Sequence, residues 1–236
     1  MPELPEVETI RRQLRSEIID KTVLRAGSHE SQKFLPAREI KGRRFTELSR
    51  RGKYLIAECD GQTELIVHLG MTGQLLIDRH EQDLTNLDQY QRAWWSLDNG
   101  KTVVFRDVRR FGRIAVVSKG DYSQIPTLRD MGPEPFSADL TGDEVWRRTR
   151  GRKRRIKTQL LSQRLIAGVG NIYADEALFL ARINPALRSI SRPQAQRLLD
   201  ALRTVLSEAI ERGGTTLRDY RNLEGEGSNQ HHLKCY

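Results

Sequence analysis

The spacing of apolar residues at the start of the chain predicts a helix. Apolar side chains recur every three or four positions, at Val7, Ile10, Leu14 and Ile18, and this spacing places them on one helix face. Pro5 suits the first turn because proline lacks the N–H that a helix start leaves unpaired, and the acidic residues around it favour the positive end of the helix dipole. We therefore predict a short amphipathic helix over residues 2–18.

Residues 21–118 show a different pattern, in which short runs rich in β-branched and aromatic residues are separated by glycines. Such runs predict strands, here over residues 53–58, 64–69, 74–78, 93–97, 102–106 and 113–118. Asn99-Gly100 lies between two of them, which is the strongest local signal for a β-hairpin. Several short strands with turn residues between them indicate an antiparallel sandwich or barrel.

Helical spacing returns in the last part of the chain. Residues 119–140 are rich in proline and glycine, a composition typical of a linker. After them we predict helices over 141–150, 156–166, 172–182 and 192–212, with a short one near 215–221. The pattern therefore predicts an α+β protein, with an N-terminal helix and antiparallel β-sandwich domain over residues 1–118, a linker over 119–140 and an α-helical domain over 141–236.

Composition narrows the class of protein. The chain has 236 residues, with 40 Lys and Arg against 31 Asp and Glu, which gives a net charge of +9 and favours an acidic partner such as nucleic acid. No apolar run approaches the roughly 20 residues of a membrane span, and the charged start does not resemble a signal peptide. The two cysteines, Cys59 and Cys235, cannot form a disulfide framework or a four-cysteine zinc site. We expect a cytoplasmic monomer that does not contact membranes.

The basic residues fall into three groups, which lie at residues 43–53, 106–113 and 147–157. A charged face is commonly just solvated. If the three groups converge in space, they instead form the electrostatic footprint of a phosphate backbone.

The first residues could supply a nucleophile. A small second residue such as Pro2 permits removal of Met1, and the secondary amine then exposed would have a pKa of about 8. Such an amine can attack a sugar aldehyde carbon and form an iminium, with Glu3 beside it as acid or base. A Met-Pro start is also common without catalytic meaning, so this pair alone does not decide.

Three other motifs have two readings each. Lys53 follows a basic turn and either approaches a phosphate or donates a proton, or is simply solvated. Met71 and Phe111 lie in glycine-flanked turns beside arginines, where they either act as wedges between bases or cap the core. The segment 168–171 between two helices presents backbone N–H groups that suit a phosphate, or forms an ordinary turn.

A series of segments resembles one enzyme family. They are, in order, MPELPEVETIRRQL, RRGKYLI, HLGMTGQL, NGKTVVFRDVRRFG, MGPEP, IKTQLLSQRLIAGVGNIYADEALF and GGTTLRDY. Together they resemble the formamidopyrimidine-DNA glycosylase family of base-excision repair enzymes, relatives of endonuclease VIII, along nearly the whole chain. The resemblance implies a β-sandwich joined to a helical domain with a helix-two-turn-helix motif.

The resemblance also implies a role for each matching residue. Pro2 is the nucleophile that attacks C1′ and forms a Schiff base, Glu3 is the acid, and Lys53 is a proton donor and phosphate contact. Glu6 and Glu176 support that centre. The residues that contact DNA are His68, Met71, Arg109, Phe111, Lys153 and Asn171, of which Met71, Arg109 and Phe111 fill the gap left by the everted base. The stretch 214–233 covers that base.

The activity implied is removal of oxidised purines, such as 8-oxoguanine or formamidopyrimidines, from damaged double-stranded DNA. The Schiff base acidifies the C2′ proton, so the 3′ phosphate leaves by β-elimination, and this step needs no metal or redox cofactor. Two alternatives remain, namely a non-catalytic module that binds damaged DNA, and an enzyme that prefers oxidised pyrimidines.

The sequence departs from the family pattern in two places. In the family a four-cysteine zinc finger follows the segment that corresponds to 231–236, and this sequence stops there. Either truncation or a member without a finger gives this ending, and we expect no cofactor and no metal in the chain as given. The second departure is Tyr90, which stands where the family usually has a histidine that contacts DNA. Tyrosine can also donate a hydrogen bond to phosphate.

Overall fold

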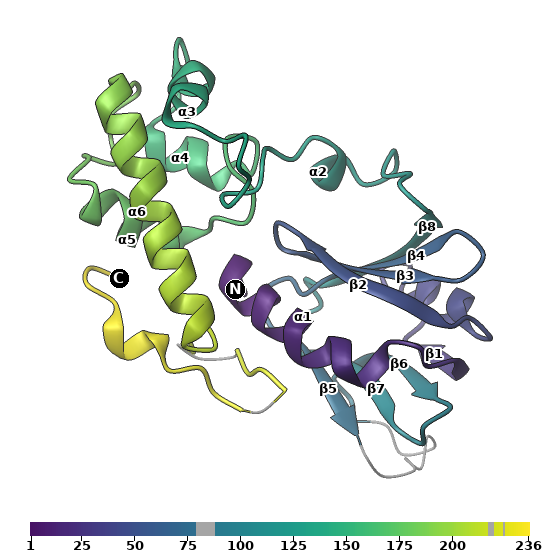
Figure 1. Cartoon of the computed structure of the whole chain (residues 1–236). Helices are drawn as coiled ribbons and strands as arrows, with labels where there is room; N and C mark the ends of the chain where they lie inside the picture. Colours follow the sequence, from purple (N-terminus) through teal and green to yellow (C-terminus); the bar gives the residue numbers. More distant parts are fainter. Residues whose placement is uncertain (79–87, 217–219, 224) are drawn as a thin grey trace.

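The computed structural model describes residues 1–78, 88–216, 220–223 and 225–236. Helix α1 (Leu4–Ile18) lies between a β-sandwich and a group of helices (Figure 1) and packs against both. Its first turn holds a proline and a capping box, in which the side chains of Glu3 and Glu6 each accept a backbone N–H of the other. The predicted N-terminal helix is confirmed.

The sandwich consists of two antiparallel four-stranded sheets. One has the order β1-β6-β7-β5, formed by Val23–Ser28, Gln91–Leu97, Thr102–Asp107 and Gly73–Asp78. The other has the order β2-β3-β4-β8, formed by Phe45–Arg51, Tyr54–Cys59, Thr63–His68 and Arg113–Ser118. The apolar stripe of α1 enters the core between the sheets, beside residues such as Phe105 and Trp95. The expected antiparallel sandwich is confirmed.

The hairpin predicted at Asn99-Gly100 joins β6 to β7. The N–H of Gly100 donates to the carbonyl of Leu97 at 3.1 Å, and Gly100 has a φ of +78°, which glycine adopts without strain. Strands β1 and β2 were not predicted. Both are edge strands, and few of their residues are buried.

The second half of the chain is helical, as predicted. The helices are α2 (Pro126–Arg129) in the proline-rich segment, then α3 (Gly142–Thr149), α4 (Ile156–Leu161), α5 (Asn171–Leu180) and α6 (Arg192–Glu211). Two short 3-10 helices, η1 (Leu35–Ile40) and η2 (Asn229–His232), are also present.

Two helix predictions need correction or limits. Helix α4 ends at Leu161 rather than 166, because Gln163 takes a φ of +61° and the chain turns toward Gly168. The short helix predicted near 215–221 falls partly on residues 217–219, which lie outside the described residues, and its described flanks are not helical. The domain boundaries at 118 and 140 stay a prediction.

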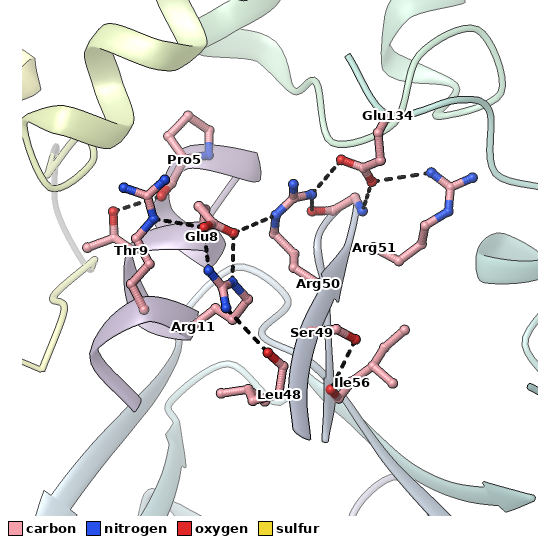
Figure 2. A network of polar contacts seen from close by, with 12 residues as sticks. Pro5, Glu8, Thr9, Arg11, Leu48, Ser49, Arg50, Arg51, Ile56 and Glu134 are labelled. Carbon is pink, nitrogen blue, oxygen red and sulfur yellow. Dashed lines mark hydrogen bonds and ion pairs between the residues drawn. The ribbon is translucent and has the colours of Figure 1, made fainter. Parts of the chain in front are cut away.

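A polar network joins α1, the β2–β3 turn and the proline-rich segment (Figure 2). The Glu134 carboxylate accepts from the Arg50 guanidinium at 2.8 Å and from the Gly52 N–H at 2.6 Å. Arg50 also donates to Glu8 of α1 at 3.2 Å. These charge-assisted bonds fix the turn that precedes Lys53 from two sides.

We predict that Trp95→Phe lowers the free energy of unfolding by about 1–3 kcal/mol, because it leaves a buried carbonyl without its donor. The Trp95 indole N–H donates to the carbonyl of Ala37 at 2.9 Å inside the core. Urea denaturation checks this value. Trp94→Phe is the matched control, since Trp94 is half-buried on the other face of β6, and a loss there as large as at Trp95 would contradict the account.

Candidate active site and DNA-binding surface

The start of α1 is docked on the start of α5. The Glu3 carboxylate accepts from the N–H groups of Gly170 at 2.7 Å and Ile172 at 3.0 Å. The Leu4 N–H donates to the carbonyl of Gly168 at 3.0 Å. A Cβ on Gly170 would lie 2.3 Å from Cδ of Glu3, so only glycine permits this approach. These two N–H groups therefore bind the chain's own carboxylate, and a phosphate contact by the other groups of the segment 168–171 stays a prediction.

Glu6 lies one turn further along α1 and is buried with Glu3. Its carboxylate accepts from the Glu3 N–H at 2.7 Å, the Tyr173 hydroxyl at 2.5 Å and the Thr215 N–H at 2.8 Å. It thus ties α1 both to α5 and to the segment that follows α6. Tyr173 and Thr215 were missed by the sequence reasoning, because nothing in their spacing indicates a buried partner.

Burial perturbs the three titratable groups of this cluster. It raises the pKa of Glu3 to about 7, against the opposing charge of Lys53, and it also raises the pKa of Glu6. Lys53 is only 6% exposed, and burial lowers its pKa while Glu3 and Glu6 act in the other direction. The alternative of a solvated basic turn at Lys53 is therefore wrong. A carboxyl that titrates near neutrality, close to an amine of lowered pKa, is suited to proton transfer.

Pro2 immediately precedes Glu3 and is buried, whereas Met1 is 52% exposed. The Pro2 nitrogen is part of the peptide bond to Met1, so it becomes a nucleophile only when Met1 is removed. The structure thus places the candidate nucleophile at the buried carboxylates.

His68 stands at the end of β4, where burial and the charge of Lys53 lower its pKa to about 4. Its ring is therefore neutral at neutral pH. Because Nδ1 accepts the Gly70 N–H at 3.1 Å, geometry assigns the ring proton to Nε2, where it can be donated.

The structure brings Met71, Arg109 and Phe111 together on the surface. Met71 lies in the β4–β5 loop and is 37% exposed, and Phe111 lies in the β7–β8 loop and is 51% exposed. The Arg109 guanidinium carbon lies 5.1 Å from the centroid of the Phe111 ring. A Cβ on Gly70 would be 2.4 Å from the carbonyl carbon of Phe111, so the two loops are in backbone contact. The alternative that Met71 and Phe111 cap the core is wrong.

The remaining DNA-contact candidates lie in separate places. Tyr90 precedes β6, with the Arg106 guanidinium carbon 4.9 Å from its ring centroid. Asn171 is exposed at the first residue of α5. Lys153 is exposed and lines a surface hollow with five arginines, at positions 148, 150, 152, 154 and 164. Most of these residues belong to the basic group at residues 147–157, which therefore forms a concave, positively charged surface.

Glu176 of α5 serves the end of the chain. Its carboxylate accepts the backbone N–H groups of Lys234, Cys235 and Tyr236, at distances of 2.8 to 3.0 Å. Its support of the centre at Pro2 stays a prediction.

Within the part of the chain that the structure describes, no group of three or more His, Cys, Asp or Glu side chains could hold a metal ion. The two cysteines have different surroundings. Cys59 is buried in β3, whereas Cys235 is exposed near the end of the chain. The described residues therefore do not fit a zinc finger. None of the described helices is long and apolar enough to cross a membrane.

We predict that a carbon-13 NMR titration of labelled glutamate carboxyls shows one group with a midpoint near 7, absent in Glu3→Gln. Lys53→Met removes the positive charge that favours ionisation of Glu3, so the midpoint should move upward. Lys101→Met is the control, because Lys101 pairs with Glu17 at the far end of β7 from the Arg109 loop. A Glu3 midpoint near 4.5, or one unmoved by Lys53→Met, would contradict this electrostatic account.

Comparison with known proteins gives two family-model matches. The model of the formamidopyrimidine-DNA glycosylase N-terminal domain matches residues 1–114, and that of the formamidopyrimidine-DNA glycosylase H2TH domain matches residues 131–221. The formamidopyrimidine-DNA glycosylase of Thermus thermophilus is 44% identical over 229 residues, which cover 95% of this chain and 82% of the relative. That of Deinococcus radiodurans is 39% identical and covers 98% of this chain and 84% of the relative.

Solved structures agree with the sequence comparisons. The MutM (Fpg) protein of Thermus thermophilus has a TM-score of 0.89 and 43% identity, covering 98% of this chain and 86% of that one. The Lactococcus lactis Fpg in complex with DNA that contains an abasic site has a TM-score of 0.87 and 32% identity, covering 98% and 86%. Sequence and fold thus agree over both the sandwich and the helices, and the chain belongs to the formamidopyrimidine-DNA glycosylase family.

Proposed function

We propose that this chain removes oxidised purine bases, such as 8-oxoguanine and formamidopyrimidines, from duplex DNA and then cleaves the strand by β-elimination through a Schiff base on Pro2. The observation that carries the proposal is the buried cluster at the start of α1, where Pro2 adjoins a carboxyl whose pKa is about 7. Family membership supports glycosylase chemistry, and the buried Lys53 supports proton transfer at this cluster.

The chemistry begins with the Pro2 amine after Met1 is removed. Its lone pair attacks C1′ of the damaged nucleotide, the C1′–N bond breaks, and the base leaves with the electron pair and takes up the proton that the Pro2 nitrogen loses. The Glu3 carboxyl donates a proton to the ring oxygen as the C1′–O4′ bond opens, which leaves an iminium between Pro2 and C1′. A carboxyl of pKa about 7 is partly protonated at neutral pH, so it can act as this acid and later accept a proton as base.

The iminium makes strand cleavage possible. It draws electrons from C2′, so a base can take the C2′ proton, and the 3′ phosphate then leaves from C3′ with its electron pair. Water hydrolyses the iminium, returns the amine of Pro2 and releases the unsaturated sugar. The ionised Glu3 and the Lys53 amine, whose pKa burial lowers, are the groups of the cluster that can accept and return these protons.

Damaged duplex DNA is the proposed partner. The Lactococcus lactis proteins of the same fold were solved with DNA that contains Fapy-dG or an abasic site. We assign the phosphate contacts in this chain to Nε2–H of His68, to Asn171 and to the hollow around Lys153, which the exposure of Asn171 and Lys153 supports. The exposed Met71, Arg109 and Phe111 form a group that can fill the space vacated by an everted base.

Single-turnover excision on a panel of lesion duplexes tests the proposal. We expect 8-oxoguanine opposite cytosine to be excised faster than 5-hydroxycytosine opposite guanine. Loss of the general acid in Glu3→Gln should slow excision by about 10²-fold or more, whereas Glu39→Gln, at an exposed glutamate, should not slow it. Faster removal of the pyrimidine would overturn the substrate class. Tight binding without excision, with Pro2 confirmed as the first residue, would show a non-catalytic binding module.

Salt dependence tests the phosphate contacts. If Lys153 neutralises one phosphate, Lys153→Gln should reduce the slope of log affinity against log salt by about 1. Lys101→Gln is the control. Lys101 directly precedes β7, at the end opposite to the loop that carries Arg109, so this variant should keep the wild-type slope. Fluorescence anisotropy with a duplex that carries a stable abasic analogue measures both. An unchanged slope in Lys153→Gln would show that the basic hollow is merely solvated.

A further inference from the structure

Asp107 is a buried acid that the proposed chemistry does not use. It ends β7 and has no exposed surface. Its Oδ1 accepts the Thr72 hydroxyl at 2.5 Å, and its Oδ2 accepts the Gly112 N–H at 2.7 Å. One carboxylate therefore binds the β4–β5 loop and the far end of the β7–β8 loop.

Thr72 completes the connection. Its Oγ1 donates to Asp107 and also accepts the Arg109 N–H at 3.0 Å. Thr72 directly follows Met71, and Arg109 begins the turn that carries Phe111. Asp107 and Thr72 thus bind the two ends of the turn that carries Phe111, through the N–H groups of Arg109 and Gly112. Thr72 also connects this turn to Met71, its neighbour in the chain.

The main chain of Asp107 reaches a third segment. Its N–H donates to the carbonyl of Tyr90 at 2.9 Å, and its carbonyl accepts from Nε of Arg92 at 2.7 Å. Arg92 is itself only 2% exposed. The segments that carry Met71, Tyr90 and the pair Arg109 and Phe111 therefore meet at one buried residue.

We propose that Asp107 and Thr72 are positioning residues that hold Met71, Arg109 and Phe111 as a single preformed unit for insertion into the duplex. The inference rests on the proposed function, because it assigns how the gap-filling residues of that same site are held.

The geometry separates this role from ordinary core packing. An apolar side chain would fill the space at the end of β7 without the cost of burying a carboxylate, yet the acceptor atoms of Asp107 are directed at the loops that carry exposed side chains. Within those loops Arg110 has a φ of +57°, a conformation that only fixed neighbours maintain in a residue with a Cβ. Because insertion must offset the loss of base stacking, loops already ordered before binding lose less entropy on insertion.

The test compares Thr72→Val, which removes the hydroxyl at nearly equal volume, with Thr72→Ser, which keeps it. Two substrates are used, an 8-oxoguanine duplex that must be opened and a single-stranded abasic oligonucleotide in which there is no gap to fill. Excision is measured under single turnover on the first, and borohydride trapping on the second. A 2-aminopurine beside the lesion reports insertion through its fluorescence.

We expect Thr72→Val to slow excision from the duplex by about tenfold or more, since the Asp107 carboxylate and the Arg109 N–H both lose a hydrogen bond, and to reduce the 2-aminopurine signal. Trapping of the single strand should stay within about twofold of wild type, and Thr72→Ser should restore both duplex readouts. Should Thr72→Val not fold, Asp107→Asn makes the same prediction, because Thr72 and Gly112 donate to different oxygens of Asp107 and the amide NH2 that replaces one of them cannot accept a hydrogen bond.

Two results would overturn the inference while leaving the proposed function intact. One is wild-type excision and fluorescence in Thr72→Val and Asp107→Asn. The other is an equal loss of activity on both substrates in these variants, which would show a structural role only. Failure of the wild-type protein to excise the lesion or to trap the single strand would instead count against the proposed function.

Discussion

The contact between the Glu3 carboxylate and the start of α5 is the interaction on which the rest of the structure depends. It places a carboxyl group at the positive end of a helix, where two backbone N–H groups at 2.7 and 3.0 Å replace the water that burial removes. It also docks the helix that belongs to the sandwich core against the helical half of the chain. The same contact therefore assembles the two halves and places Pro2 at their junction.

That junction holds more charge than a stable core requires. Glu3, Glu6 and Lys53 are all buried, and unpaired charges in such surroundings cost several kcal/mol each. The structure offsets this cost with hydrogen bonds from Tyr173 and Thr215 to Glu6 and with the proximity of Lys53 to both acids. A second polar joint, between Glu8, Arg50 and Glu134, holds the turn before Lys53 (Figure 2). The buried titratable groups at this junction are therefore those of the candidate active site, and hydrogen bonds and opposite charges around them stabilise their burial.

Much of the fold could be predicted from residue patterns, because apolar spacing reports directly on which face is buried. Residue patterns predicted α1, the hairpin at Asn99-Gly100 and the helices α3 to α6. They did not predict β1 and β2, since both are edge strands whose residues are largely polar or partly exposed. The resemblance to a family suggested the site residues, whereas residue types alone left Lys53 and Met71 open between two readings. The burial of Lys53 and the hub at Asp107 depend on segments far apart in the chain, which no local pattern encodes.

The identity of the residue that becomes bonded to the sugar tests the account most directly. Borohydride reduction on a duplex with one abasic site converts the iminium into a stable bond, and peptide mapping by tandem mass spectrometry then locates it. The account predicts a single modified peptide that begins at Pro2, with Met1 absent and the sugar remnant on the proline nitrogen. An adduct on Lys53 or on another lysine, with Pro2 free and unmodified, would contradict it.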